Sequence, residues 1–227
     1  KHQYYLAEQK DDQRLNYYPM DKRGIIEYAH LESQVLSNYD KAETLLDRYL
    51  DEEMYDYEAL VEAGDNYMRW AVEEPSKYEQ AREVYAILLE KYGGRPEVLF
   101  RMLRYFIRTD NYKEVQRLKN EFQANTSITV NPAIYAELGG YLLDKNQLED
   151  VREILFRALD ADETEPAAHY HLSRYFREIE DYGEERTALT KAIRYLKEAK
   201  PYTKHELAML VNAHNRTGEV NYREEKY

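Results

Sequence analysis

A pattern of apolar and small residues occurs twice in this chain, with the second copy displaced by 34 residues from the first. A period of this size is typical of stacked helical hairpins, in which every hairpin buries its apolar face against its neighbours. Because such arrays usually present a long surface to another protein or peptide, the pattern favours a binding function over catalysis. The first copy consists of Tyr135, Leu138, Gly139, Leu142, Leu148, Leu155 and Ala158, and the second of His169, Leu172, Ser173, Phe176, Tyr182, Leu189 and Ala192.

The same pattern extends along most of the chain. The residues that open the second helix of each hairpin follow one another at intervals of 39, 34, 36 and 34 positions. The hairpins therefore keep their core positions and differ in the lengths of their loops. The five openers are Tyr39, Tyr78, Tyr112, Leu148 and Tyr182.

Prolines and a glycine pair indicate where helices begin and end. Pro96, Pro132, Pro166 and Pro201 each stand just ahead of an apolar periodic run, where the fixed φ of proline and its missing N–H are tolerated. Asn131 is a candidate N-cap, and Gly93-Gly94 is typical of a helix stop. We expect eleven helices, near residues 24–37, 40–50, 56–71, 76–92, 96–109, 112–124, 132–144, 147–160, 166–180, 183–199 and 203–217.

The acidic composition restricts the choice of partner. The formal net charge of −12 argues against nucleic acid or an anionic membrane surface as the main partner. The chain has no cysteine, which excludes disulfides, thiol nucleophiles and cysteine-ligated zinc. No apolar stretch approaches the roughly 20 residues that a membrane-spanning helix needs. We therefore expect a soluble segment without direct membrane insertion.

The chain begins at Lys1 and not at a methionine, which indicates a processed or trimmed piece of a longer protein. A signal peptide or an anchor ahead of it stays an open alternative. The cytoplasm and the periplasm both fit, so the sequence does not assign a compartment.

The pattern resembles that of the tetratricopeptide repeat (TPR) family. In this family the first helix carries an aromatic residue, then Leu-Gly three residues on and then another aromatic, and the second helix carries an alanine, an aromatic and an alanine. The segment 63–67 (Ala-Gly-Asp-Asn-Tyr) and the pair Leu138-Gly139 match this pattern best. The resemblance covers roughly residues 24–200. It implies an all-α fold, an α-solenoid of about five to six stacked helix-turn-helix hairpins that form a right-handed superhelix.

Larger or charged residues replace small ones at several positions of the family pattern. Leu103 and Ser173 stand where the family has glycine, and Glu185 stands where it has alanine. Since two helices approach closely only where side chains are small, these residues predict wider or rotated crossings.

The domain organisation follows from the repeat. Residues 1–23 are expected to form an N-terminal extension or capping helix, in which Tyr4, Tyr5, Leu6, Tyr17 and Tyr18 belong to a docking helix or an extended cap. Residues 24–227 are expected to form the TPR-like domain. Its hairpins lie near 24–50, 56–92, 96–124, 132–160 and 166–199, with a final partial repeat over 203–227.

The resemblance also implies where a partner binds, because the first helix of each hairpin lines the groove in this family. Five arginines occupy its groove-facing positions in an otherwise acidic chain. Arginine forks suit carboxylates and aromatic planes, so we expect a protein or peptide partner with acidic and apolar side chains. The alternative is that these arginines pair with neighbouring Asp and Glu. The candidate groove residues are Met68, Arg69, Phe100, Arg104, Arg108, Tyr170, Arg174 and Arg177.

Small residues mark one further feature of the same face. Ala136 and Gly140 occupy groove-facing positions and suggest a flat spot that a partner approaches closely.

Catalytic, cofactor and metal sites find little support in the sequence. His169 and His171 are two positions apart, so on a helix they point in different directions. We expect no enzymatic activity, no cofactor and no metal site. The favoured function is a scaffold or adaptor within a larger complex. The alternatives are a helical regulatory or substrate-positioning domain of a larger enzyme, and a repeat protein that self-associates through its terminal repeat, around 207–211.

Overall fold

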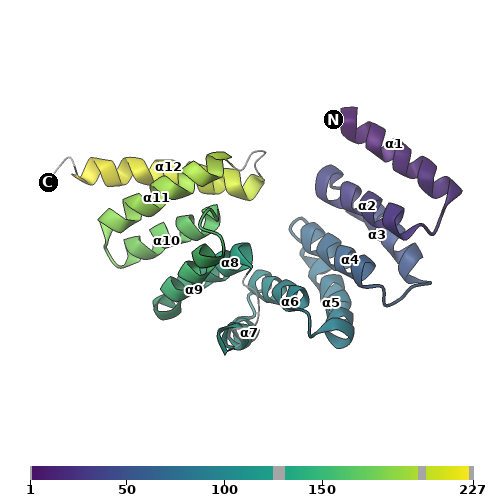
Figure 1. The fold of residues 1–227 in the computed structure, drawn as a ribbon, viewed down its shortest axis with the longest axis horizontal. Helices are drawn as coiled ribbons and strands as arrows, with labels where there is room; N and C mark the ends of the chain where they lie inside the picture. Colours follow the sequence, from purple (N-terminus) through teal and green to yellow (C-terminus); the bar gives the residue numbers. More distant parts are fainter. Residues whose placement is uncertain (1, 125–130, 199–202, 225–227) are drawn as a thin grey trace. The chain divides into compact units, whose positions relative to one another are not determined.

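The computed structural model describes residues 2–124, 131–198 and 203–224. These residues form α-helices joined by short connections, with one π-helical segment, η1 (Leu31–Leu36), one 3₁₀ segment, η2 (Pro75–Lys77), and no strand (Figure 1). The expected all-α fold is confirmed. The α-helices are α1 (His2–Tyr17), α2 (Lys22–His30), α3 (Tyr39–Leu50), α4 (Tyr57–Trp70), α5 (Tyr78–Tyr92), α6 (Pro96–Arg108), α7 (Tyr112–Ala124), α8 (Pro132–Asp144), α9 (Leu148–Ala161), α10 (Pro166–Glu178), α11 (Tyr182–Glu198) and α12 (Lys204–Glu224).

Each of the eleven expected helices is present in the described residues, and most ends agree within a few positions. The last helix continues to Glu224, well beyond the expected end at 217. A further helix, α1, lies within residues 1–23, where the sequence allows a docking helix or an extended cap. The assignment of these residues as a separate extension stays a prediction.

The chain divides into two compact units, Lys1–Gln123 and Ala124–Tyr227. In the N-terminal unit, consecutive helices pack as the pairs α2–α3 and α4–α5. In the C-terminal unit, α8 packs on α9, α10 packs on α11, and α12 packs along α11 (Figure 1).

The helix ends follow local chemistry. Pro96, Pro132 and Pro166 are the first residues of α6, α8 and α10, and Pro201 lies outside the described residues. The side chain of Asn131 accepts a hydrogen bond from the backbone N–H of Ile134 at 3.1 Å, which confirms it as an N-cap.

The turns inside four hairpins share one backbone conformation. Ser37, Asp110, Asn146 and Glu180 have φ values of 59°, 54°, 56° and 62°, and each lies two residues ahead of the second helix. In the last three, the next backbone N–H donates to a carbonyl five residues earlier, which is the Schellman arrangement. Glycine normally occupies this left-handed position. Because Ser, Asp, Asn and Glu stand there instead, the sequence marks these turns less clearly than a glycine would.

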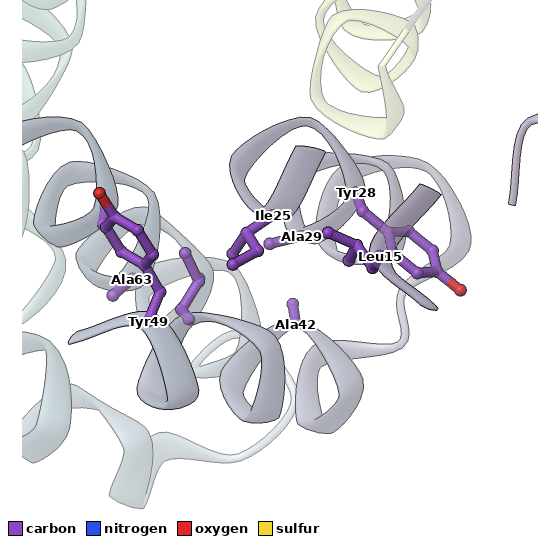
Figure 2. Packing of buried hydrophobic residues seen from close by; sticks show 9 residues of the cluster. Leu15, Ile25, Tyr28, Ala29, Ala42, Tyr49 and Ala63 are labelled. Atoms are coloured by element: carbon purple, nitrogen blue, oxygen red, sulfur yellow. The ribbon is translucent and has the colours of Figure 1, made fainter. Parts of the chain in front are cut away.

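A shared apolar cluster joins α1 to the first hairpins of the N-terminal unit (Figure 2). Leu15 is the buried residue that α1 contributes, and it packs with Ile25 and Ala29 of α2. The hydroxyl of Tyr28 donates to Asp12 of α1 at 2.7 Å. Tyr17 and Tyr18 are exposed and take no part in this docking. The side chains of Tyr4, Tyr5 and Leu6 lie outside the described residues.

Two hairpins close around a glycine on the first helix. A Cβ atom at Gly64 would lie 2.8 Å from Cδ1 of Tyr85, and one at Gly139 would lie 2.7 Å from Cγ of Leu155. Tyr85 and Leu155 occupy the same position of the second helix, seven residues after its opener. A glycine on one helix therefore accommodates a large side chain on the other, as expected for a close crossing.

Replacing Gly139 with valine should force Leu155 and the α8–α9 crossing apart. We expect Gly139→Val to lower the free energy of unfolding by about 1–3 kcal/mol in urea titrations. Gly94→Val is the matched control, because a side chain at Gly94 meets nothing within 4 Å. Equal stability of the two variants would contradict the close crossing.

A buried ion pair holds α12 in the C-terminal unit. Glu185 of α11 is 1% exposed, and its carboxylate accepts from Nε and Nη2 of Arg216 at 2.6 and 3.0 Å. These hydrogen bonds raise the pKa of Arg216 above its ordinary value. Glu185, which stands where the family has alanine, thus binds α12 through Arg216.

Removing Arg216 should leave the Glu185 carboxylate buried without its cation. We expect Arg216→Ala to destabilise the fold by about 3–5 kcal/mol, measured by chemical unfolding. Glu219 also pairs with Arg216 but is exposed. We expect Glu219→Ala to lower the free energy of unfolding by less than about 1 kcal/mol. Similar losses in both variants would show that the buried pair has no special role.

Candidate protein-binding surface

The expected groove residues of the N-terminal unit lie on α4 and α6, and only some of them face solvent. Met68 is partly buried. Arg69 donates from Nη1 to the hydroxyl of Ser33 at 2.8 Å and to Oε1 of Glu62 at 2.9 Å. Glu62 is itself buried and contacts Nδ1 of His30 at 3.1 Å. Arg69 therefore ties α4 to the π-helical turn, which is a structural role.

Phe100 lies in the core of the N-terminal unit. It is 7% exposed and packs against Phe122 of α7, with 5.3 Å between the ring centroids. A helical hairpin gains more from burying this ring than from leaving it in a groove. Its side chain does not reach a partner on the surface.

Three arginines form a stripe along α6. Arg101, Arg104 and Arg108 are spaced by three and four positions, which places them on one face of the helix. Arg104 and Arg108 are exposed, and Arg101 is partly buried. With Glu97 as its only acidic residue, α6 is a basic helix in an acidic chain. We call Arg101, Arg104 and Arg108 the basic stripe.

An ion pair to α4 positions the basic stripe. The guanidinium of Arg101 donates from Nε and Nη2 to the carboxylate of Asp65 at 3.0–3.2 Å. The hydroxyl of Tyr85 donates to the same carboxylate at 2.9 Å. Burial raises the pKa of Tyr85 well above its ordinary value, the charge of Asp65 adds to this, and the charges of Arg101 and Arg104 oppose it. The carboxylate of Asp65 thus links Arg101 of α6 to Tyr85 of α5.

The family pattern overlooks Arg101, because it stands one position after a groove-facing site. Its spacing of three from Arg104 and seven from Arg108 is the signal that identifies it.

The expected groove residues of the C-terminal unit, all on α10, are mostly engaged in local contacts. Arg174 pairs with Asp144 of α8 at 2.5 Å, and Arg177 pairs with its neighbour Glu178 at 3.5 Å. Tyr170 is partly buried and packs against the apolar cluster that α11 and α12 share. The alternative prediction, that the arginines pair with neighbouring Asp and Glu, is therefore confirmed for Arg69, Arg174 and Arg177.

The ring of His171 fills the space over Gly140. A Cβ atom at Gly140 would lie 2.5 Å from Cε1 of His171, and Ala136 is fully buried. The interpretation of this stretch as a flat spot is wrong, because α10 covers it. Burial, and next the charge of Arg174, lower the pKa of His171 to about 3.

The depressed pKa of His171 predicts a loss of stability in acid. Between pH 6 and 4 the unfolded chain protonates this ring and the folded chain does not, so stability is present above about pH 6.5 and falls with pH. The groups that act on the ring are Arg174, Asp144 and His205. We expect His171→Gln to flatten the pH dependence of the unfolding free energy by about 1.4 kcal/mol per pH unit.

The control for this experiment is His214→Gln, since His214 is exposed on α12. It should leave the slope between pH 6 and 4 as in the parent chain. A parent-like slope for His171→Gln would contradict the buried, neutral state of the ring.

Other chemistry-bearing residues have structural contacts. Lys22 of α2 pairs with Asp56, the N-cap residue of α4, at 2.8 Å and with Glu58 in the first turn of α4 at 2.7 Å. His169 stacks on Tyr195 with 5.4 Å between centroids. Within residues 2–124, 131–198 and 203–224, no group of three or more His, Asp or Glu side chains is placed to hold a metal ion. No helix of the same ranges is long and apolar enough to cross a membrane.

The arrangement of hairpins matches solved structures. A tetratricopeptide repeat protein from Parabacteroides merdae ATCC 43184 is 14% identical, with a TM-score of 0.71 over 94% of this chain and 78% of that chain. The chain has the tetratricopeptide repeat fold. PilW, described as a type IV pilus biogenesis factor, shares the TPR fold with 14% identity and a TM-score of 0.63 over 87% of this chain and 90% of that chain.

A third TPR structure is YrrB, described as a TPR protein with an unusual peptide-binding site. It is 15% identical, with a TM-score of 0.52 over 90% of this chain and 97% of that chain. No protein-family model and no curated protein matches the sequence. At these identities the likeness establishes the TPR fold and leaves the partner to the surface chemistry.

Proposed function

We propose that this chain is a non-catalytic scaffold that binds a segment of another protein along the first helices of its N-terminal unit. The segment carries Asp or Glu together with apolar side chains. The observation that supports this most is the basic stripe on α6, which concentrates positive charge in a chain of net charge −12. An acidic segment gains charge-assisted hydrogen bonds from the exposed guanidinium groups of this stripe.

Apolar side chains on α4 and α6 explain why we expect the bound segment to carry apolar residues as well as acidic ones. Ile107 precedes Arg108 and is partly exposed, as is Met68 of α4. The flexible thioether of methionine adapts to apolar residues of a partner, and isoleucine adds apolar area that the partner buries. YrrB is a TPR protein with a peptide-binding site, so the TPR fold is compatible with this kind of function.

Fewer of the expected groove residues are therefore expected to bind the segment: Met68, Arg104 and Arg108, together with Arg101, whose ion pair to Asp65 positions the stripe. Arg174 and Arg177 belong to the other unit of the chain.

The test is the binding of a library of acidic, basic and apolar peptides, each about 15 residues long, to the chain and its variants. Arg104→Ala combined with Arg108→Ala should weaken the tightest binders about 30-fold, because each lost charge-assisted contact contributes about 1 kcal/mol. Helicity and thermal unfolding should stay within experimental error, since both side chains are exposed. Fluorescence anisotropy measures the affinities.

A matched control removes two arginines from second helices. Arg82 of α5 and Arg117 of α7 are exposed and pair only with acidic residues one turn away. Arg82→Ala with Arg117→Ala changes the net charge equally and should leave binding unchanged. Equal weakening by both pairs, or a preference for basic peptides, would refute the proposal.

A further inference from the structure

The helix α12 has one side packed into the C-terminal unit and one side exposed. Met209, Ala213 and Val220 are at most 5% exposed, and Arg216 on the same side forks Glu185. Side chains on the opposite side are open to solvent: Leu207 is 50%, Val211 is 51% and Tyr222 is 60% exposed. The exposed apolar residues therefore do not belong to the core that anchors the helix.

Gly218 lies on the same exposed side. A Cβ atom there would meet nothing within 4 Å, so the packing of this chain does not require a glycine. Glycine in the middle of an exposed helix costs about 1 kcal/mol relative to alanine. The position is thus unfavourable for the isolated helix and becomes useful when another backbone approaches it.

We call Leu207, Val211, His214, Gly218 and Tyr222 the outer face of α12. None of these residues is Asp, Glu, Lys or Arg, whereas 33% of the whole chain is charged. An uncharged apolar stripe on a helix is typical of a contact with another helix.

The spacing along the outer face is symmetrical. Leu207, Val211, Gly218 and Tyr222 follow one another at intervals of four, seven and four positions, so the face has the same spacing in both directions. When two such helices lie antiparallel, Val211 of one faces Gly218 of the other, and Leu207 faces Tyr222. A larger side chain then meets a glycine twice, on either side of a two-fold axis that passes between His214 and Asn215.

We propose that two copies of this chain associate through the outer faces of α12, antiparallel and in this register. A two-fold contact uses the same patch on both partners, which this palindromic spacing provides. Because each copy carries a net charge of −12, self-association is opposed over most of the surface by like charges. The outer face avoids this repulsion at the contact. A helix pair is a small interface, so the association is weak and concentration-dependent.

Sedimentation equilibrium of the full chain measures this association directly. We expect the mean mass to rise toward that of a dimer between about 10 µM and about 1 mM. Gly218→Lys should raise the dissociation constant at least tenfold, because a long charged side chain then occupies the space that Val211 of the other copy needs. Its melting temperature should be unchanged or higher, since lysine favours helix more than glycine does.

Gly94→Lys is the matched control, because a side chain at Gly94 also meets nothing within 4 Å and lies in the N-terminal unit. It should dimerise like the parent chain. A monomeric parent chain at the highest concentration overturns the proposal. So does a dimer that Gly218→Lys leaves intact.

The absence of cysteine allows the register to be tested by cross-linking. In the proposed dimer the two copies of His214 lie next to the axis, so His214→Cys should form a disulfide-linked dimer under mild oxidation. The two copies of Leu207 are separated by 15 positions along the paired helices, or about 22 Å, so Leu207→Cys should not link to itself. A mixture of Leu207→Cys and Tyr222→Cys should cross-link.

Efficient self-linking of Leu207→Cys would indicate a parallel arrangement and overturn the register. These outcomes are independent of peptide binding on α6, since the two faces belong to different units of the chain.

Discussion

The close crossing of the two helices in a hairpin is the constraint on which the α4–α6 surface depends. At Gly64 the missing side chain lets the ring of Tyr85 lie against α4. The hydroxyl of Tyr85 then reaches Asp65, and the same carboxylate holds Arg101 of the next hairpin. Arg101 in turn fixes the face of α6 that carries Arg104 and Arg108. Gly64 of α4 thus influences, through Tyr85 and Asp65, how the arginines of α6 are oriented.

Buried polar residues reinforce the repeat in the C-terminal unit. Glu185 stands where the family has alanine, and it binds Arg216 of α12. His171 covers Gly140 of the preceding first helix. Buried polar groups are costly without partners, so each of these two residues is tied to a specific neighbour. They specify which helix packs where, in addition to the apolar core.

The helical fold could be predicted from the sequence because periodicity, prolines and caps act locally, as at Pro132 and Asn131. The site could be predicted only in part, because ion pairs depend on which helices become neighbours. Arg69 and Arg174 occupy the positions that the family pattern predicts. Arg69 nevertheless bonds Ser33 of η1 and Glu62 of its own helix, and Arg174 pairs with Asp144 of α8. Phe100 follows the apolar periodicity into the core. The role of Arg101 emerges only once the fold brings its guanidinium to Asp65 of α4.

Hydrogen exchange with mass spectrometry tests whether the first helices of the N-terminal unit bind the peptide. The chain is compared with and without a saturating amount of its tightest acidic and apolar peptide. We expect slower exchange in the segments that contain α4 and α6, residues 57–70 and 96–108, and unchanged exchange in α5 and α7. Protection confined to the second helices, or to the C-terminal unit, would contradict a binding surface on the first helices of the N-terminal unit.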